Sequence, residues 1–274
     1  MASRLLAAGW RVVGFDLAGT EQRLPEGATA AVSVAGVAAA TETVLLSLPE
    51  GTAVDAVSKE IAASAERRAA VVIDTSTIGI EAAREAAATL AAANITYVDA
   101  PVSGGVSGAK TGSLAMMIAT DAAVFDRHRP MLGAIAKNCF HVGEVVGQGQ
   151  AMKLLNNFLS GTAMAATAEA ISFGIDHGLD MAVMLDVLNV SSGQSTATSD
   201  KFLRRVLTGT YDAGFATRMI SKDVKLYEQC VADSDATSVV GAVVSELLKR
   251  ADAALPGSDF TRIYEFVRAS RRAG

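Results

Sequence analysis

The sequence predicts an α/β domain with a parallel sheet over residues 1–147, followed by an all-helical domain over residues 148–274. Short apolar runs alternate with alanine-rich helical patterns as far as Gly143, which is the rhythm of βαβ units. After Gly143 the strand patterns stop and only helical patterns continue. Runs that are apolar on both faces fit a parallel sheet covered by helices on its two sides.

Each apolar run in the first half ends in a polar or turn residue, as a buried strand does. The predicted strands, in order, are Arg11–Asp16, Val44–Leu48, Val71–Asp74, Ile95–Val98, Ser113–Ile118 and Asn138–Val142. Helices are predicted over Glu81–Ala93 and Asp121–Ile135. The domain boundary is expected near Gly147–Gly149, where the last strand pattern gives way to a long helix.

The second half is expected to begin with a helix from Gln150 to about His177. Its stretch Ala151–Ile175 is almost entirely apolar, more than a small helical domain usually covers alone, so a homodimer or homotetramer is expected. Breaks between the later helices are predicted at turn-forming segments. These segments are Gly178–Asp180, Ser191–Gly193, Gly209–Gly214 and Pro256–Ser258.

Composition excludes several classes of function. A net charge of -5 and the lack of a basic stripe argue against a nucleic-acid partner. Cys139 and Cys230 are isolated and the three histidines are scattered, so the spacing predicts neither a disulfide framework nor a metal site. No charge-free apolar run reaches about 18 residues and no signal peptide pattern is present, so a cytoplasmic protein without a membrane span is expected.

The segment Asp99-Ala-Pro-Val-Ser-Gly-Gly105 directly follows a predicted strand, where open α/β sheets bind their ligands. Ser103 offers a hydroxyl, and Gly104 and Gly105 let backbone N–H groups approach an anion without a side chain between them. A small carboxylate would suit such a segment. The alternative is an ordinary Pro/Gly turn that leads into the next element.

Lys153 and Asn157 stand four residues apart on the predicted long helix, so they project from one face. Their neighbours are mostly apolar, and a desolvated lysine favours its neutral form, which brings its pKa toward the range of a proton-transfer group. The alternative is a lysine whose stem lies on the surface and whose charge reaches solvent.

Together with these two segments, several separated blocks resemble the β-hydroxyacid dehydrogenase family, which includes 3-hydroxyisobutyrate dehydrogenase, tartronate semialdehyde reductase and L-threonate dehydrogenase. The resemblance runs from Met1 to about Phe266. The blocks are Asp16 after a strand, Leu48-Pro49, Asp74-Thr-Ser-Thr77, Asp99–Gly105, Gly147–Lys153 with Asn156-Asn157, and Lys222-Asp223. The family implies a Rossmann-like dinucleotide-binding domain before a helical domain, and hydride transfer between NAD and a small β-hydroxy acid.

The resemblance also implies roles for individual residues. Lys153 would be the catalytic acid or base, and Lys222 would reach the nicotinamide side. Ser103, Gly104, Gly105 and Asn157 would hold the substrate carboxylate, and Leu48, Pro49 and Thr77 would line the cofactor cleft. Without the family, Lys222-Asp223 is simply a surface ion pair.

Asp16 is the acidic residue expected to bind the adenosine ribose, and its charge favours NAD over NADP because Leu17–Thr20 supplies no arginine for a 2′-phosphate. Such a residue follows a glycine-rich loop by about 20 residues, so that loop would precede Met1. Met1–Gly9 resembles the family's first helix, so the first strand is also missing. We expect the encoded enzyme to begin upstream, and the present chain to leave Arg11–Asp16 and Val71–Asp74 facing a gap.

Two alternatives remain open from the sequence. A homologue without the glycine loop could be a catalytically silent subunit or small-ligand binder. A related imine reductase would share the architecture, but such enzymes usually replace the catalytic lysine, and Lys153 is present. One departure from the family is Ala119-Thr120-Asp121, where relatives often carry glycines after the strand.

Overall fold

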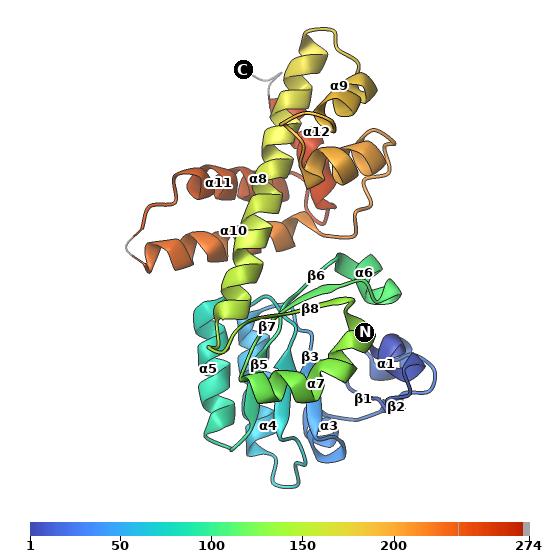
Figure 1. Ribbon diagram of the computed structural model, residues 1–274, viewed down its shortest axis with the longest axis vertical. Coiled ribbons are helices and arrows are strands. Elements are labelled where there is room, and N and C mark those ends of the chain that lie inside the picture. The colour runs from blue at the N-terminus through green and yellow to red at the C-terminus, as the bar shows by residue number, and fades with distance from the viewer. Residues whose placement is uncertain (235, 271–274) are drawn as a thin grey trace. The chain divides into compact units, whose positions relative to one another are not determined.

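The computed structural model describes residues 1–234 and 236–270 and divides into two compact units, Met1–Lys153 and Leu154–Gly274. The N-terminal unit carries the sheet (Figure 1). Its elements are α1 (Ala2–Ala7), β1 (Val13–Gly14), α2 (Thr20–Arg23), β2 (Thr29–Ala30), α3 (Val34–Ala40), β3 (Thr43–Leu46), α4 (Gly51–Ala63), β4 (Val71–Asp74), α5 (Ile80–Ala91), β5 (Thr96–Asp99), β6 (Val102–Ser103), α6 (Gly105–Thr111), β7 (Ala115–Ala119), α7 (Ala122–Ile135) and β8 (Asn138–Gly143).

The main sheet has six strands in the order β3-β4-β5-β7-β6, with β8 paired to β7. Strands β3, β4 and β5 are parallel, and their register sets Asp74 opposite Asp99 where β4 and β5 end. β7 runs antiparallel to β5 and β6 but parallel to β8. The expected parallel sheet is therefore a mixed one, because the chain reverses direction between β6 and β7, through α6.

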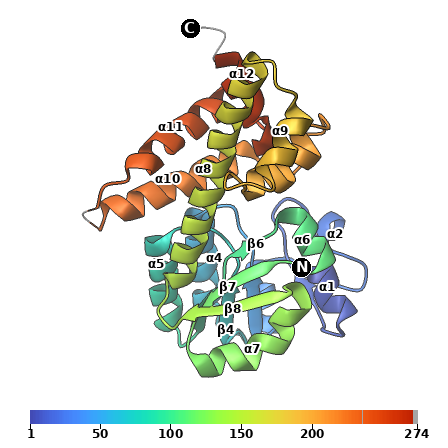
Figure 2. The ribbon, with the colours of Figure 1, turned by 45° about the horizontal axis from the view of Figure 1, so that its top comes forward.

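Helices cover both faces of this sheet, as the two-sided apolar strands require (Figures 1 and 2). On one face Val72 packs in a cluster with Ile61 of α4 and Leu90 of α5. On the other face Ile73 packs in a cluster with Leu132 of α7. Alternate residues of β4 thus enter different cores, which explains why every residue of the strand is buried.

The second unit consists of helices, as predicted: the rest of α8 (Gln148–Asp176), α9 (Met181–Leu188), the π-helix η1 (Ala197–Val206), α10 (Thr217–Ala232), α11 (Val239–Ala254), the 3-10 turn η2 (Phe260–Arg262) and α12 (Ile263–Ser270). Its core includes Met164 and Ile171 of α8, Phe202 of η1 and Leu248 of α11. All four predicted breaks fall between helices. The break between Ala232 and Val239 was not predicted, since residues 233–238 include no glycine or proline.

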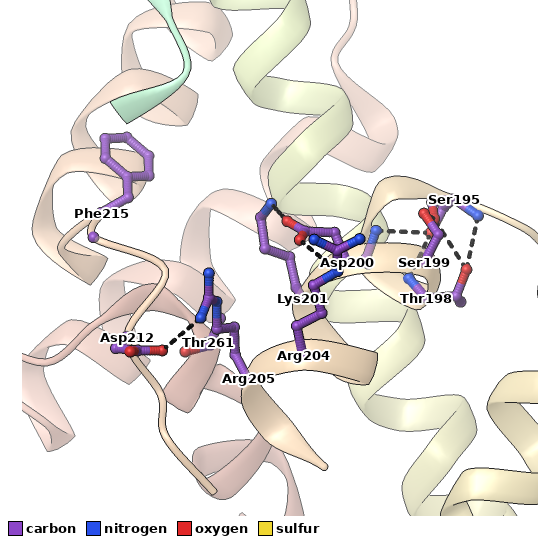
Figure 3. A network of polar contacts seen from close by, with 12 residues as sticks. Ser195, Thr198, Ser199, Asp200, Lys201, Arg204, Arg205, Asp212, Phe215 and Thr261 are labelled. Carbon is purple, nitrogen blue, oxygen red and sulfur yellow. Dashed lines mark hydrogen bonds and ion pairs between the residues drawn. The ribbon is translucent and has the colours of Figure 1, made fainter. Parts of the chain in front are cut away.

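Figure 3 shows the polar contacts that hold η1. Ser195 Oγ accepts hydrogen bonds from the backbone N–H groups of Ala197 and Thr198, which begin this helix. Asp200 pairs with Lys201 and Arg204, and Arg205 pairs with Asp212 at 3.1 Å. These contacts lie within the C-terminal unit and stabilise the short segment between α9 and α10.

Three further details of the N-terminal unit differ from the predictions made from the sequence. The pairing of β1 with β2 forms a separate two-stranded sheet, and β3 is the terminal strand of the larger one. Val71–Asp74 was expected to face a gap, but this strand pairs with β3 and β5 on its two sides. The short strands β2 and β6 were also not predicted, because two residues give too little pattern to recognise.

α8 is long and apolar enough to span a membrane by length and composition alone. The core helix of a soluble protein passes the same test, and 44% of the relevant window is buried inside the protein. In the sequence, charged residues interrupt the apolar run of this helix, so no membrane span was predicted there. Lys153 and Glu169 are those residues.

Candidate active site

The carboxyl ends of β3 and β4 bring together two of the segments expected to line a cofactor cleft. Leu48 follows β3 and Thr77 follows β4. The backbone N–H of Leu48 donates to Ser76 Oγ at 2.8 Å, which fixes one segment against the other. Pro49 extends the first segment and is exposed. Ser76 was not singled out from the sequence, although it lies inside the Asp74–Thr77 block.

Two buried carboxylates lie at the ends of β4 and β5. Asp74 accepts hydrogen bonds from the Ser76 N–H at 2.9 Å and from the Tyr97 hydroxyl at 2.9 Å. Burial raises the pKa of Asp74, and the hydrogen bonds from Ser76 and Tyr97 only partly oppose this effect. Burial also raises the pKa of Tyr97, and the charge of Asp74 adds to the shift.

Asp99 binds the backbone at the start of α8. Its Oδ2 accepts from the N–H groups of Gly147 at 2.9 Å and Gln150 at 3.1 Å, and its Oδ1 accepts from Gln150 Nε2 at 2.9 Å. Burial raises the pKa of Asp99, while the hydrogen bonds from Gln150 and Gly147 lower it, and burial is the larger effect. Asp99 therefore caps the helix that carries Lys153.

The expected carboxylate-binding segment lies between β6 and α6. Ser103 ends β6 and is half-buried, and Gly104 and Gly105 are exposed. Gly104 has φ 124° and Gly105 has φ 60°, so both adopt a backbone conformation that favours glycine. A Cβ on Gly104 would lie 3.1 Å from Leu114 Cδ2, which adds a steric reason for glycine there. The segment is thus more constrained than an ordinary surface turn.

Lys153 lies near the start of α8 and is buried, with 7% of its surface exposed. The expectation that Lys153 is not solvent-exposed is confirmed by this burial. A lysine whose charge simply reaches solvent does not fit this burial. Asn157 follows one turn later on the same helix, belongs to the C-terminal unit and is 4% exposed.

Asp223 connects two predicted site residues within the C-terminal unit. Asn157 Nδ2 donates to Asp223 Oδ2 at 2.6 Å, and Lys222 Nζ lies 3.1 Å from Asp223 Oδ1. Asp223 is only 2% exposed, so it is not part of a surface ion pair. Its role was missed because a Lys-Asp pair on a helix carries no signal of burial by itself.

Asp16 follows β1 and is half-buried on the two-stranded sheet. Its Oδ1 accepts from the Ala18 N–H at 2.8 Å, and its Oδ2 lies 3.3 Å from Arg23 Nη1. A carboxylate after a parallel strand fits the ribose hydroxyls at the adenosine end of a dinucleotide. Arg23 was not predicted as a neighbour, because it lies beyond Leu17–Thr20, the residues that directly follow Asp16.

Several of the predicted residues therefore fall into two hydrogen-bonded groups, to which Asp16, Ser103, Gly104 and Gly105 are not connected by the hydrogen bonds described above. In the N-terminal unit, Ser76 and Gln150 connect the segments that carry Leu48, Thr77 and Lys153. In the C-terminal unit, Asp223 connects Asn157 with Lys222.

Comparison with known proteins agrees with this arrangement of a sheet unit and a helical unit. Residues 1–143 match the NAD binding domain of 6-phosphogluconate dehydrogenase. Residues 147–267 match the model described as NAD-binding of NADP-dependent 3-hydroxyisobutyrate dehydrogenase. The two matches together cover nearly all the residues on which the site depends.

Individual relatives extend over almost the whole chain. A 3-hydroxyisobutyrate dehydrogenase from Pseudomonas aeruginosa is 36% identical over 98% of this chain and 94% of its own. A 2-(hydroxymethyl)glutarate dehydrogenase from Eubacterium barkeri is 36% identical over 82% of this chain and 76% of its own. The structure of Mycobacterium tuberculosis 3-hydroxyisobutyrate dehydrogenase with L-serine has a TM-score of 0.90 and 29% identity, covering 97% of this chain and 94% of its own. The chain therefore belongs to the β-hydroxyacid dehydrogenase family and is an NAD(P)-dependent oxidoreductase of hydroxy acids.

Proposed function

We propose that this enzyme transfers a hydride between NAD and a small β-hydroxy acid, with Lys153 as the general acid or base. The observation that carries the proposal is a buried lysine one helical turn before a buried asparagine on α8. A lysine amine can take up and release a proton when it lies within hydrogen-bond reach of the reacting group. General acid–base catalysis of this kind accelerates a reaction about 10²–10⁴-fold.

The roles of the protein residues follow from the proton balance. Bound NAD would accept the hydride from the alcohol carbon. Neutral Lys153 takes the proton of the hydroxyl group in oxidation, and the ammonium form returns a proton to the carbonyl oxygen in reduction. Because Asp99 and Gln150 hold the first turn of α8, Lys153 needs little rearrangement to act.

In this proposal the substrate carboxylate is bound by Ser103, Gly104, Gly105 and Asn157. The hydroxyl of Ser103 and the side-chain amide of Asn157 are donors, and glycine lets backbone N–H groups approach an anion. Asp223 keeps the Asn157 amide oriented by accepting one of its hydrogens. Lys222, held by the same carboxylate, serves the nicotinamide side.

In this proposal the cofactor cleft is lined by Leu48, Pro49 and Thr77. Asp16 accepts hydrogen bonds from the hydroxyl groups of the adenosine ribose. We propose NAD as the preferred cofactor because the Asp16 carboxylate would repel a 2′-phosphate. Arg23 lies beside this carboxylate, and its pairing with Asp16 at 3.3 Å opposes its use as a partner for a 2′-phosphate.

The substrate class is supported by the ligands and reactions in the relatives' names. 3-Hydroxyisobutyrate, 2-(hydroxymethyl)glutarate and L-serine all carry a hydroxymethyl group on the carbon next to a carboxylate. We propose an acid of this kind, or one of the glycerate/tartronate semialdehyde or threonate type.

A substrate panel tests the proposal. With short β-hydroxy acids as substrates, the formation of NADH is followed by its fluorescence. With cyclic imines as substrates, the consumption of NADH and of NADPH is followed in the same way. Turnover with a β-hydroxy acid is expected. Turnover of imines alone would favour a reductase of another class, and cofactor binding that fails altogether would favour a silent homologue.

We also propose a homo-oligomer, working in the cytoplasm. In the C-terminal unit, apolar side chains are exposed on three helices, among them Leu159 of α8, Val183 of α9 and Val243 of α11. An open groove of about 620 Å³ lies among α8, α11 and α12, and apolar residues such as Val243 and Phe266 line it. Exposed apolar surface of this kind favours association with a second copy.

A further inference from the structure

Gln150 uses the full hydrogen-bonding capacity of its side-chain amide inside the N-terminal unit. Its Oε1 accepts from the N–H groups of Ile78 at 2.9 Å and Gly79 at 3.2 Å. Its Nε2 donates to Ser76 O at 3.1 Å and to Asp99 Oδ1 at 2.9 Å. A primary amide offers two hydrogens and two lone pairs, so each of them has a partner. Gln150 is fully buried.

Asp99 completes the connection from the other side. It is also fully buried, and it binds the N–H groups of Gly147 and Gln150 at the first turn of α8. A negative carboxylate at this end of a helix is additionally stabilised by the helix dipole. Lys153 lies three residues beyond Gln150 on the same helix.

Glycines make this close docking possible. A Cβ on Gly149 would lie 2.7 Å from Met117 O and 2.9 Å from Asp99 Cγ. A Cβ on Gly147 would lie 2.8 Å from Ile80 Cγ2, and Gly147 has φ 102°. The first turn of α8 is therefore pressed against β5 and β7 with no room for a side chain, which leaves its register little freedom.

The network continues to the proposed cofactor side. Gln150 binds Ser76, Ile78 and Gly79, which flank Thr77. Ser76 Oγ in turn accepts from the Leu48 N–H at 2.8 Å. A continuous chain of hydrogen bonds thus connects both cofactor segments with the helix turn that precedes Lys153.

We propose that Asp99 and Gln150 are positioning residues for hydride transfer, which fix Lys153 relative to the segments that carry Leu48 and Thr77. This inference rests on the proposed role of Lys153. It adds a physical reason for the spacing Gly147-Gln-Gly-Gln150: the glycines permit contact, and the final glutamine connects the helix to two strand ends. A misplacement of about 1 Å at a reacting group can cost about 10² in rate.

The decisive measurement is a double-mutant cycle on the single-turnover rate of hydride transfer. Gln150→Met keeps an unbranched side chain of similar length but removes all four hydrogen bonds. We expect it to slow hydride transfer at least about tenfold when Lys153 is present, and less than about twofold in the Lys153→Ala background. An equal loss in both backgrounds would overturn the positioning role, because Gln150 would then act without Lys153.

The same cycle separates this inference from the proposed function. If Lys153→Ala leaves hydride transfer unchanged, the role of Lys153 fails and the positioning role fails with it. If Lys153→Ala slows transfer strongly but the effect of Gln150→Met is independent of it, only the positioning role fails.

If Gln150→Met does not fold, Asp99→Asn is the second variant, because it disturbs fewer hydrogen bonds. The carbonyl oxygen of the new amide can still accept from Gly147 and Gln150, but its NH₂ group would face Gln150 Nε2, another donor. We expect the same dependence on Lys153 with a smaller loss. No effect on hydride transfer in either background would contradict the proposal.

Amide hydrogen exchange gives a readout that needs no turnover. Gln150→Met should accelerate exchange at Ile78 and Gly79, which lose their acceptor, and at Gly147 in the adjacent turn. Tyr97→Phe is the matched control: it removes a buried hydrogen bond to Asp74 but none to α8. It should leave exchange at Gly147 and the hydride-transfer rate within about twofold. Unchanged exchange in Gln150→Met, or an equal rate loss in Tyr97→Phe, would overturn the proposal.

Discussion

At the scale of single residues, Lys153 carries the most direct prediction. Its replacement by alanine removes the proposed proton-transfer group but none of the proposed cofactor contacts. We therefore expect kcat to fall at least about 10²-fold, while affinity for NAD changes little. Steady-state kinetics and nicotinamide fluorescence titration measure the two quantities separately.

Ser103→Ala serves as the contrasting variant for this measurement. A carboxylate anchor is felt in the ground state and the transition state alike, so KM should rise more than kcat falls. If Lys153→Ala keeps kcat within a factor of about three, Lys153 does not transfer the proton.

Asp16 decides the choice of cofactor. Asp16→Asn removes the negative charge and releases Arg23 from its ion pair, so the 2′-phosphate of NADP meets less repulsion. We expect the ratio of kcat/KM with NAD to that with NADP to exceed one in the native enzyme and to decrease in the variant. The proposal is wrong if the native enzyme already has a higher kcat/KM with NADP.

Asp74 predicts a pH dependence of stability. Its pKa in the folded state lies above the ordinary value of 3.8 because of burial. The folded state therefore binds its proton more tightly, and this contribution to stability is complete below about pH 3.8 and is lost as the pH rises through the folded pKa. Asp74→Asn carries no charge that must be buried. The free energy of unfolding of the variant minus that of the native chain, measured by urea titration, should therefore increase between about pH 4 and pH 7. A difference that does not change with pH would contradict the raised pKa of Asp74.

At the scale of elements, the first turn of α8 packs closely against β5 and β7. Gly149→Ala places a methyl group against Met117 O and Asp99, both of which are held by backbone or by hydrogen bonds. We expect overpacking to lower the free energy of unfolding by about 1–3 kcal/mol. Denaturant unfolding measures this difference.

Gly133→Ala is the matched control on α7. A Cβ at Gly133 meets nothing within 4 Å, and the residue is exposed within a helix. Alanine is the better helix former there, so the same substitution should raise stability by about 0.5–1 kcal/mol. If Gly149→Ala raised the free energy of unfolding as Gly133→Ala does, α8 would not be docked closely against Asp99.

At the scale of the whole molecule, the exposed apolar residues of α11 predict self-association. Val240 and Val243 lie near the beginning of this helix, and Val243 is 69% exposed. Replacing both by glutamate suits the helix dipole, so the fold should persist while a complementary apolar surface is lost. Sedimentation should show the native chain above its 28.1 kDa monomer mass and the variant closer to it. Val32→Glu, at an exposed position of the N-terminal unit, is the control, and a native monomer would refute the oligomer.

The sequence predicted the two kinds of unit and the longer elements, because apolar runs and alanine-rich helices have clear periods. It did not predict that β7 reverses direction, since strand direction depends on pairing between distant segments. For the site, Lys153, Asn157 and Asp99–Gly105 stand in local motifs. The contact of Asp223 with Asn157 and the contacts of Gln150 could not be predicted, because a buried hydrogen bond joins residues far apart in the chain and leaves no local pattern.

The continuity of α8 has a consequence for substrate length. Lys153 and Asn157 are four residues apart on one helix, so their backbone positions differ by about 6 Å along its axis, at ~1.5 Å per residue. The helix thereby sets the spacing between the proposed proton-transfer group, Lys153, and the proposed carboxylate ligand, Asn157. An acid with additional carbons between its hydroxyl and its carboxylate cannot reach both without bending. Discrimination against longer acids would then reside in the backbone of α8, and enlarging the surrounding side-chain space would not abolish it.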